Sequence, residues 1–455
     1  MYLQKIKSEG LAHLSYFIGS GNVAAVVDPR RDHDIYERIA ANKGMRITHI
    51  FETHRNEDYV IGSVSLAERT GARIFHGANM DFQYGTAVSD GETFELESVG
   101  LKVLETPGHT FESISIVLYD KKSGEDAVGV FTGDALFIGD VGRTDFFPDR
   151  KEEVAGLLHD SIFKKLVPLG EHVIIYPAHG SGSVCGAGLA TREFSTIGYE
   201  IRNNPMLKMN KEEFIRHKTQ EKHPLPPYFK KMEEYNKNGA PEMCGLPLPA
   251  PMGAKEFTEA IEKKDMVVID MRSPEAFAGA FIPGSLAIPL GMFPSYGGWF
   301  VSYDKPIGIV VENESQVDTA VRYLLRMGYD NIQAYLDKGL HEWETSGRKF
   351  DRVPAVHAED LVERINRGEE LTLLDVRKEG EFESGHLPKA VNIYLGDIEK
   401  HLDKVSKDRP VVTFCGSGRR AIIAASILKR NGYDKVEDCL GSIKACSAIG
   451  CPIEK

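Results

Sequence analysis

Short apolar runs that end beside a polar residue and a Gly or Pro recur along residues 1 to about 200. Four of them end in a His or an Asp: Ile47 to Phe51 before His54, Leu101 to Leu104 before His109, Ala127 to Phe131 before Asp134, and His172 to Tyr176 before His179. Runs of this length predict buried strands, and helical patterns such as Val60 to Thr70 and Lys151 to Leu158 lie between some of them. The pattern predicts a strand-rich, layered α/β domain in which four loops converge on one rim.

The remainder of the chain contains a linker and an internal repeat. Residues 203 to 238 are charged and helical in pattern, and four prolines between Ala240 and Pro251 predict an extended linker. Beyond it, Asp270-Met271-Arg272 aligns with Asp375-Val376-Arg377, an offset of 105 residues (270 to 375), and Pro306 aligns with Pro410, an offset of 104 (306 to 410). We therefore expect domains at 1–240, 252–350 and 354–455, the last two being copies of one α/β unit.

Composition narrows the classes of partner. The net charge is -12 at pH 7 and no block of Lys or Arg stands out, which argues against nucleic acid. No apolar run approaches the ~20 residues needed to span a membrane, and no secretory signal is evident at the N-terminus. Six cysteines in 455 residues are more typical of thiols in a reducing cytoplasm than of a disulfide framework. We expect a cytoplasmic protein, and the sequence leaves its oligomeric state open, homo-oligomers included.

In the second copy, the run Val411 to Phe414 leads into Cys415-Gly416-Ser417-Gly418-Arg419-Arg420 and then an apolar helix. Small residues after Cys415, Gly418 among them, let backbone N–H groups point into one concavity that can hold an anion. The helix start with Arg419 and Arg420 adds positive potential, which favours a thiolate nucleophile at Cys415. The plainer interpretation, a buried cysteine before a helix, gives no reason for the Gly and Arg content.

The first copy differs at this position. Val311 aligns with Cys415, and Glu312 and Glu314 follow it where the second copy has Gly416 and Gly418. This loop has no nucleophile and its carboxylates would repel an anion. We interpret the first copy as structural, a spacer or docking surface.

The second copy resembles a rhodanese, or sulfurtransferase, domain. The resemblance rests on Asp375-Val376-Arg377, on Gly385-His386-Leu387-Pro388-Lys389-Ala390-Val391-Asn392 and on the Cys-x-x-Gly-x-Arg loop. It implies that Cys415 carries sulfane sulfur as a persulfide. Lys389 stands where the family more often has Gly. Cys446 falls near the position where the family usually has Trp, so we interpret Cys446 as a packing residue.

Residues 1 to about 200 resemble the metallo-β-lactamase fold, an αββα sandwich, whose first motif is His-x-His-x-Asp-His. This chain has His54, Asn56, Asp58 and Tyr59 there, so two of the usual metal-binding side chains are missing. In the family the first subsite uses positions 54, 56, 109 and 134, and the second uses 58, 59, 134 and 179. Each subsite has lost one His.

The surviving donors of the first subsite are His54, His109 and Asp134. Two His and one carboxylate form the facial triad of non-haem Fe(II) oxygenases, whereas a hydrolytic dinuclear zinc site needs both subsites. The resemblance therefore implies one Fe(II) per chain. We expect Asp58, His179 and Tyr59 to orient the ligands or water rather than bind the iron.

A further segment, Gly142-Arg143-Thr144-Asp145-Phe146, resembles one that marks persulfide dioxygenases within this fold. It implies that Arg143, with Asp145, binds a thiol substrate. The Gly-rich rim from 180 to 188 departs from glutathione-specific members, and Cys185 in it is either a small residue in a tight loop or a thiol that handles sulfane sulfur.

The whole chain resembles fusion proteins that join a persulfide dioxygenase, a degenerate rhodanese domain and an active one. The resemblance implies oxidation of a low-molecular-weight thiol persulfide by O2 to sulfite and thiol, followed by transfer of sulfane sulfur from Cys415 to sulfite, giving thiosulfate. One alternative is a glyoxalase II-like dinuclear zinc thioester hydrolase fused to a sulfurtransferase. The other is a non-catalytic sulfur carrier or docking protein with a vestigial metal site.

Overall fold

The computed structural model describes residues 1–186, 188–243 and 245–454, which form two compact units. The first comprises Met1–Leu246 with Leu325–Gly328, and the second comprises Pro247–Leu324 with Tyr329–Lys455. Among the described residues, no helix combines the length and the apolar character that crossing a bilayer requires.

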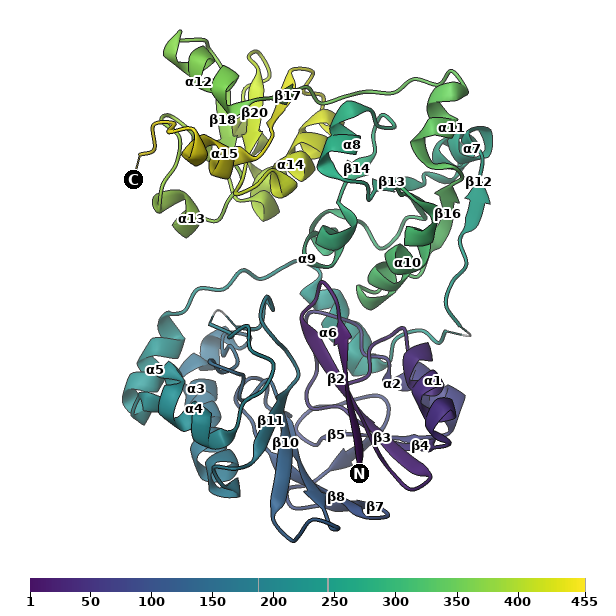
Figure 1. Ribbon diagram of the computed structural model, residues 1–455, viewed down its shortest axis with the longest axis vertical. Coiled ribbons are helices and arrows are strands. Elements are labelled where there is room, and N and C mark those ends of the chain that lie inside the picture. Colours follow the sequence, from purple (N-terminus) through teal and green to yellow (C-terminus); the bar gives the residue numbers. More distant parts are fainter. Residues whose placement is uncertain (187, 244, 455) are drawn as a thin grey trace. The chain divides into compact units, whose positions relative to one another are not determined.

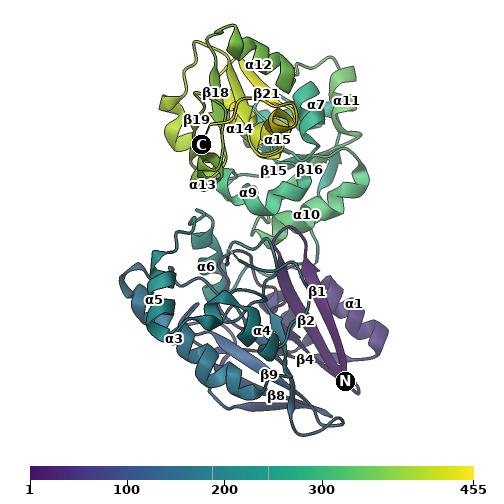
Figure 2. The same ribbon diagram turned by 60° about the vertical axis from the view of Figure 1, so that its left-hand side comes forward.

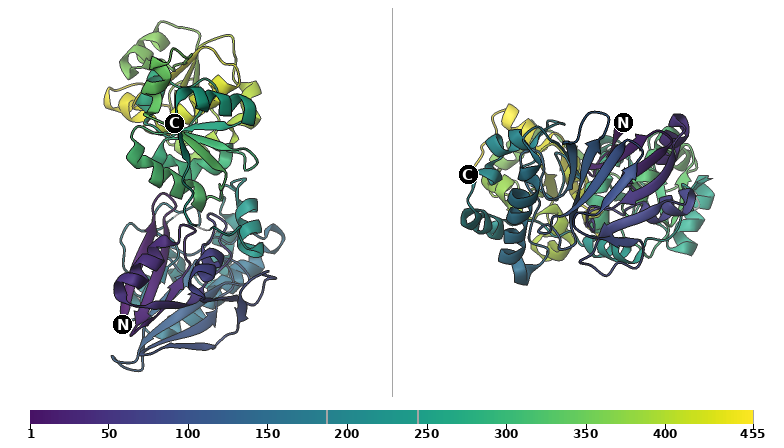
Figure 3. Two further views of the ribbon diagram at one scale, coloured as in Figure 1. Left: turned by 90° about the vertical axis from the view of Figure 1, so that its right-hand side faces the viewer. Right: turned by 90° about the horizontal axis from the view of Figure 1, so that it is seen from below.

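Two sheets face each other in the first unit (Figures 1 and 3). The six-stranded sheet has the order β1-β2-β3-β4-β5-β6, and the five-stranded sheet the order β11-β10-β9-β8-β7. The strands of the first are β1 Tyr2–Ser8, β2 His13–Ser20, β3 Val23–Val27, β4 Arg46–Phe51, β5 Arg73–Gly77 and β6 Thr86–Val88. The strands of the second are β7 Thr93–Leu96, β8 Val99–Glu105, β9 Ile114–Asp120, β10 Ala127–Gly133 and β11 Ile174–Pro177.

Helices cover the outer face of each sheet. In Figure 1, α1 and α2 lie outside the first sheet, and α3, α4 and α5 lie outside the second. The helices of this unit are α1 Asp34–Lys43, α2 Ser63–Thr70, α3 Lys151–Ser161, α4 Ile197–Asn203, α5 Lys211–Gln220 and α6 Phe229–Asn238. The four layers confirm the predicted αββα sandwich.

The alternation of β3 shows how the sequence builds these layers. Ala25 and Val27 belong to the core between the two sheets, whereas Ala24 and Val26 belong to the core between the first sheet and its helices. Successive side chains of a strand point to opposite faces, so a strand with apolar layers on both sides is apolar at every position.

Two parallel five-stranded sheets make up the second unit, with the orders β12-β16-β15-β13-β14 and β17-β21-β20-β18-β19. The first sheet contains β12 Ala250–Met252, β13 Val267–Asp270, β14 Leu286–Ala287, β15 Ile307–Val310 and β16 Ile332–Leu336. The second sheet contains β17 Ala355–Val356, β18 Thr372–Asp375, β19 Val391–Asn392, β20 Val411–Phe414 and β21 Val436–Cys439. The first sheet carries helices α7 Ala254–Lys264, α8 Pro274–Gly279, α9 Phe293–Phe300, α10 Val317–Arg326 and α11 Gly339–Thr345 (Figure 1). The second sheet carries α12 Ala358–Asn366, α13 Glu379–Glu383, α14 Arg419–Arg430 and α15 Ser442–Ala448 (Figure 2).

The register of the strands reproduces the repeat seen in the sequence. Val267 pairs with Ile307 in the first copy, and Thr372 pairs with Val411 in the second. These pairs differ by 105 residues (267 to 372) and 104 residues (307 to 411). The two copies are therefore one fold.

The backbone also explains why Lys389 is unusual. Lys389 has φ 61°, and Gly284 at the equivalent position of the first copy has φ 84°. Left-handed backbone suits Gly, because a Cβ there crowds the following carbonyl. The second copy therefore accepts local strain that the first avoids.

One predicted boundary was wrong. The helical pattern from Val60 predicts a helix start there, but α2 begins at Ser63. Tyr59 O accepts from the side-chain amide of Asn236 at 2.7 Å, and Ile61 N donates to the side-chain oxygen of the same residue at 2.9 Å. These hydrogen bonds hold the stretch before α2 in an extended loop.

Candidate active sites: a metal centre and a cysteine loop

The four His and Asp side chains that end the predicted strands meet in the first unit. His54 follows β4, His109 follows β8, Asp134 follows β10 and His179 follows β11. All four are almost completely buried. The loop of His179 is fixed from β2, because Leu14 N donates to Ala178 O at 2.7 Å.

Asp134 lies between the first two histidines. Its Oδ2 is 3.4 Å from His109 Nε2 and 3.7 Å from His54 Nε2. Donor atoms about 2.1 Å from a shared metal ion lie about 3.0 to 3.8 Å apart, so these distances suit one ion. Neither Nε2 has a hydrogen-bond partner among the described residues, although both are buried.

Hydrogen bonds fix the tautomer of both rings. Thr53 donates its hydroxyl to Asp28 at 2.8 Å, so its oxygen accepts from His54 Nδ1 at 2.9 Å. His109 Nδ1 donates to the carbonyl of Arg143 at 2.9 Å. Because Nδ1 carries the proton in each ring, both Nε2 atoms keep a lone pair for a metal. The donor set therefore fits a metal ion.

His179 joins two carboxylates beside this set. Its Nδ1 is 2.7 Å from Asp134 Oδ1, and its Nε2 is 3.1 Å from Asp58 Oδ2. Burial lowers the pKa of His179, but Asp134 and Asp58 outweigh it and raise the pKa well above its ordinary value. The structure thus places the His179 ring between Asp58 and Asp134. That Asp58 and His179 orient the metal ligands stays a prediction.

Tyr59 lies behind this group. Its ring packs on that of His13, with centroids 3.9 Å apart, and is 6.2 Å from the ring of His179. The phenol oxygen is buried and makes no hydrogen bond within the described chain.

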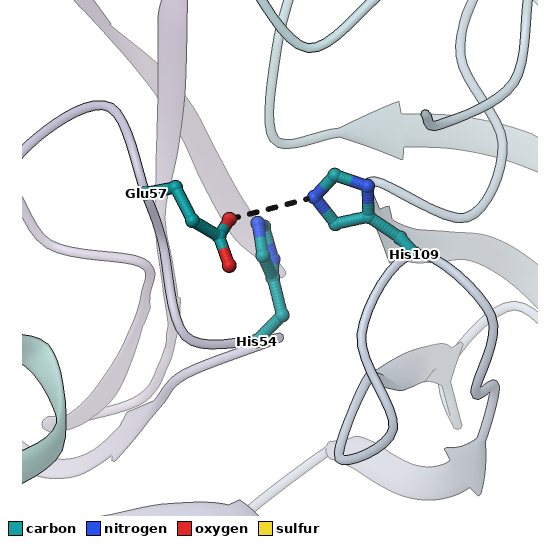
Figure 4. Close-up of side chains that lie close together, drawn as sticks. All are labelled: His54, Glu57 and His109. Atoms are coloured by element: carbon teal, nitrogen blue, oxygen red, sulfur yellow. Dashed lines mark ion pairs between the residues drawn. The ribbon is translucent and has the colours of Figure 1, made fainter. Parts of the chain in front are cut away.

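Glu57 is a functional candidate that the sequence analysis missed. Its Oε2 lies 3.8 Å from His109 Nε2 (Figure 4), and donor atoms of His54, Glu57 and His109 lie within 4.8 Å of one another. Burial raises the pKa of Glu57 to about 8, against the opposing charge of Arg55. The signal was present, since Glu57 directly precedes Asp58, but it occupies a position that the family motif leaves undefined.

Arg143 is buried and fully engaged with protein groups. Its Nε and Nη2 donate to Asp145 at 2.6 and 2.7 Å, and its Nη1 is 3.3 Å from the carbonyls of Val184 and Pro224. Arg143 and Asp145 therefore brace the loop that carries Cys185. Substrate binding by this pair stays a prediction.

Cys185 lies closer to the metal donors than the sequence could show. Its thiol lies within 4.8 Å of donor atoms of Asp58 and His179. It also lies within 4.8 Å of donor atoms of His109 and Asp134. Burial, with the carboxylates of Asp58 and Asp134, raises the pKa of the Cys185 thiol well above its ordinary value.

In the second unit, Cys415 follows β20 and precedes α14. Its Sγ accepts a hydrogen bond from Gly418 N at 3.0 Å, and its own N–H donates to the hydroxyl of Ser442 at 3.1 Å. Gly418 has φ 96°, so a residue with a Cβ would be strained where the loop turns into the helix. The loop directs at least one backbone N–H at the sulfur.

The two arginines of this loop differ in their environment. Arg420 donates to both oxygens of Glu381, at 2.7 and 2.8 Å, so its charge is largely neutralised rather than free to act on the thiol. Arg419 is exposed and, with Lys444, lines a cavity of about 570 Å³. Arg419 is thus the better placed of the two for an incoming anion.

The first copy contributes to the surroundings of this loop. Its Ser273, Pro274 and Glu275 line the same cavity, and α14 packs against α8 and β14 (Figure 1). Burial raises the pKa of Tyr296 in α9, against the opposing charge of Arg420. The sequence analysis missed these residues, because contacts between the copies leave no motif.

The equivalent loop of the first copy is closed by its own side chains. Gln316 Oε1 accepts from the backbone N–H groups of Glu312 and Asn313 at 3.1 and 3.2 Å, and Glu312 Oε1 accepts from the Ser273 hydroxyl at 2.9 Å. Two N–H groups that could face an anion are therefore already used.

Comparisons with known proteins agree with this architecture. Residues 9–179 match the metallo-beta-lactamase superfamily, and residues 253–346 and 357–448 match the rhodanese-like domain. The matches confirm the predicted fold class.

Individual relatives cover different parts of the chain. A mitochondrial persulfide dioxygenase, ETHE1, of Bos taurus is 29% identical over 214 residues, 44% of this chain and 74% of that protein. The hydroxyacylglutathione hydrolase GloC of Haemophilus influenzae is 29% identical over 206 residues, 40% of this chain and 87% of that one. A sulfurtransferase of Allochromatium vinosum is 33% identical over 101 residues, 22% of this chain and 94% of that protein.

Among solved structures, a metallo-beta-lactamase from Staphylococcus aureus superposes with a TM-score of 0.65 at 29% identity. The similarity covers 74% of this chain and 98% of that one, so it extends beyond the sandwich into the second unit.

The packing around Gly142 yields a test of the metal centre. A Cβ at this position would lie 2.1 Å from Asp134 O and 3.0 Å from His109 Nδ1. Gly142→Ala should displace one or both donors and lower metal affinity by about tenfold or more. Chelator competition followed by elemental analysis measures this. The control is Gly156→Ala, where the new Cβ meets only ordinary contacts from 3.6 Å. Unchanged affinity in Gly142→Ala would contradict the assigned donors.

The closed loop of the first copy yields a second test. The double variant Val311→Cys, Cys415→Ser should transfer no more sulfur from thiosulfate to cyanide than Cys415→Ser alone. The reason is that Gln316 already accepts from the backbone N–H groups of Glu312 and Asn313, which an anion would need. Formation of thiocyanate measures the transfer. Substantial activity in the double variant would show that a cysteine alone suffices in this fold.

Proposed function

Because the chain belongs to the metallo-β-lactamase superfamily in its first unit and to the rhodanese-like family in its second, we propose that it is a persulfide dioxygenase coupled to a sulfurtransferase. The first site oxidises a low-molecular-weight thiol persulfide with O2 to sulfite and thiol. The second passes sulfane sulfur to that sulfite and yields thiosulfate. The relatives named persulfide dioxygenase and sulfurtransferase support the two halves separately.

A single observation carries the oxygenase half. His54 Nε2, His109 Nε2 and Asp134 Oδ2 form a compact set of two imidazoles and one carboxylate, and one His of each usual subsite is absent. This set is typical of mononuclear non-haem Fe(II), one ion per chain. When bound, Fe(II) supplies the redox chemistry that activates O2 and open positions for the substrate.

The remaining residues of the site hold this set in place. Asp28 and Thr53 fix the ring of His54, and the Arg143 carbonyl fixes that of His109. His179 holds Asp134 from the other side, and Asp58 holds His179 in turn. Their burial excludes water from the donors, which limits side reactions of a persulfide.

A cavity beside His179 offers space for the thiol part of the substrate. It measures about 400 Å³ and is lined by Lys5, Lys7, His13, His179 and Arg192 among others. A small thiol fits this volume. The basic side chains of the lining are already paired with carboxylates, Lys5 and Lys7 with Glu193 and Arg192 with Glu200.

The chemistry balances without a further reductant. In the first reaction RSSH, O2 and H2O give RSH, HSO3⁻ and H⁺, and the outer sulfur loses four electrons to O2. In the second, Cys415 thiolate takes the outer sulfur of another RSSH and releases RSH. Sulfite then attacks the outer sulfur of the Cys415 persulfide, and thiosulfate leaves with the thiolate restored.

A dinuclear alternative is favoured by one observation. Asp58, His179 and Cys185 also place donor atoms within 4.8 Å of one another, which would suit a second metal ion. A glyoxalase II-like zinc thioester hydrolase fused to a sulfurtransferase would use both positions. It predicts two zinc ions and no O2 uptake.

The two steps should separate by mutation. Cys415→Ser leaves an alcohol that cannot carry a persulfide, whereas the metal donors lie in the other unit. O2 uptake with a persulfide substrate should continue, and the product should shift from thiosulfate to sulfite. His54→Ala should lose O2 uptake and still transfer sulfur from thiosulfate to cyanide.

Enzyme-free controls are needed because sulfite reacts slowly with persulfide unaided. If Cys415→Ser abolished O2 uptake in folded, metal-loaded protein, Cys415 would act before the metal site and the proposed order would be wrong.

A further inference from the structure

The cavity beside the Cys415 loop is lined by charged side chains from both copies. Arg419 and Lys444 come from the second copy and Glu275 comes from the first, and all three are exposed. None of them forms an ion pair with another of the described residues. Within the part of the chain that the structure describes, the cavity therefore offers two unpaired cations and one unpaired carboxylate to a ligand.

Backbone contacts connect this cavity to the sulfur of Cys415. Lys444 N donates to Gly416 O at 3.2 Å, which ties the start of α15 to the loop. Gly418, whose N–H lies 3.0 Å from Cys415 Sγ, also lines the cavity. A ligand in the cavity therefore touches the residue that hydrogen-bonds the sulfur.

Glu275 is held at the start of α8 and acts on the second copy. The Ser273 hydroxyl accepts from Ala276 N at 3.3 Å and so caps this helix. Burial and the charge of Glu275 raise the pKa of Asp438 in β21 to about 7, so the Glu275 carboxylate lies near the second copy. At the repeat offset of 105 residues (275 to 380), the second copy has Gly380, so the fold itself does not require a carboxylate at this position.

The volume and the charges of the cavity together indicate what it binds. About 570 Å³ lies in the range of roughly 300 to 1,000 Å³ that is typical of sites for organic ligands, and an inorganic anion would fill only a small part of it. Arg419 and Lys444 suit a carboxylate. Glu275 would repel a ligand that carries negative groups alone, whereas it suits an ammonium group.

We propose that the sulfur donor to Cys415 is a zwitterionic thiol persulfide, which carries an ammonium and a carboxylate, and that Glu275 of the first copy selects it. This rests on the sulfurtransferase half of the proposed function and names its substrate class. Arg419 and Lys444 bind the carboxylate, and Glu275 binds the ammonium.

The transfer itself needs no oxidant. The Cys415 thiolate attacks the outer sulfur of the donor, an S–S bond forms between them, and the bond from the outer to the inner sulfur breaks. The proton of the outer sulfur passes to the departing thiolate, so the donor leaves as a thiol.

The test compares two donors on the full-length protein, without air so that no persulfide is oxidised by O2. Cysteine persulfide carries both charged groups, and 3-mercaptopropionate persulfide differs from it by lacking the ammonium. The rate at which Cys415 gains sulfur is measured by mass spectrometry after rapid quenching with an alkylating agent. The readout is the ratio of the two rates relative to that of the parent, because the donors differ in intrinsic reactivity.

Glu275→Gln should lower this ratio by about fivefold, the factor that an exposed ion pair can supply. Transfer from cysteine persulfide should slow, and transfer from 3-mercaptopropionate persulfide should become faster because its carboxylate is no longer repelled. Lys444→Gln should slow both donors and leave the ratio unchanged. The matched control is Glu256→Gln, which removes an exposed carboxylate from the first turn of α7, outside the cavity, and should keep both rates.

An unchanged ratio in Glu275→Gln, or an equal fall in Glu256→Gln, would overturn the inference while sulfur transfer to Cys415 still stood. Unchanged rates in Lys444→Gln would overturn the assigned carboxylate site. If Cys415 of the parent gained no sulfur from either donor, the sulfurtransferase half of the proposed function would fail, and this inference with it. Transfer from 3-mercaptopropionate persulfide in Glu275→Gln checks that its loop is folded.

Discussion

Buried imidazole and carboxylate groups at the strand ends of the sandwich impose the main constraint on the first unit. His54, His109, Asp134 and His179 are held out of water, and such groups are costly unless they are paired. His179 meets this requirement with two carboxylates, Asp58 and Asp134. The Nε2 atoms of His54 and His109 do not, because their protons are committed to Thr53 and to the Arg143 carbonyl. The loops are therefore built so that a cation completes them.

In the second unit, two copies of one fold have different roles. One fold occurs twice with the same strand order and register, yet only the second copy keeps a cysteine loop with an N–H directed at the sulfur. In the first copy Gln316 has taken the equivalent donors, while α8 and β14 pack against α14. The first copy has kept its packing role beside the Cys415 loop and lost the means to bind an anion.

The sequence predicted those features that leave a local pattern. Strand ends marked by His, Asp, Gly and Pro revealed the four converging loops, and the repeat of Asp-x-Arg revealed the duplicated domain. It could not show that Arg420 is neutralised by Glu381 or that Arg143 is enclosed by Asp145 and two carbonyls, because a charge in a motif does not reveal its partner. Glu57 was missed for a related reason. Its carboxylate matters through its distance to His109, and that distance depends on the bend of the loop before α2.

Anomalous diffraction at the iron edge, from crystals of protein purified and loaded with Fe(II) without air, tests the central claim most directly. The account predicts one peak per chain, between His54, His109 and Asp134, and no peak between Asp58 and His179. Two peaks of similar occupancy, one in each position, would contradict a mononuclear centre and favour the dinuclear hydrolase.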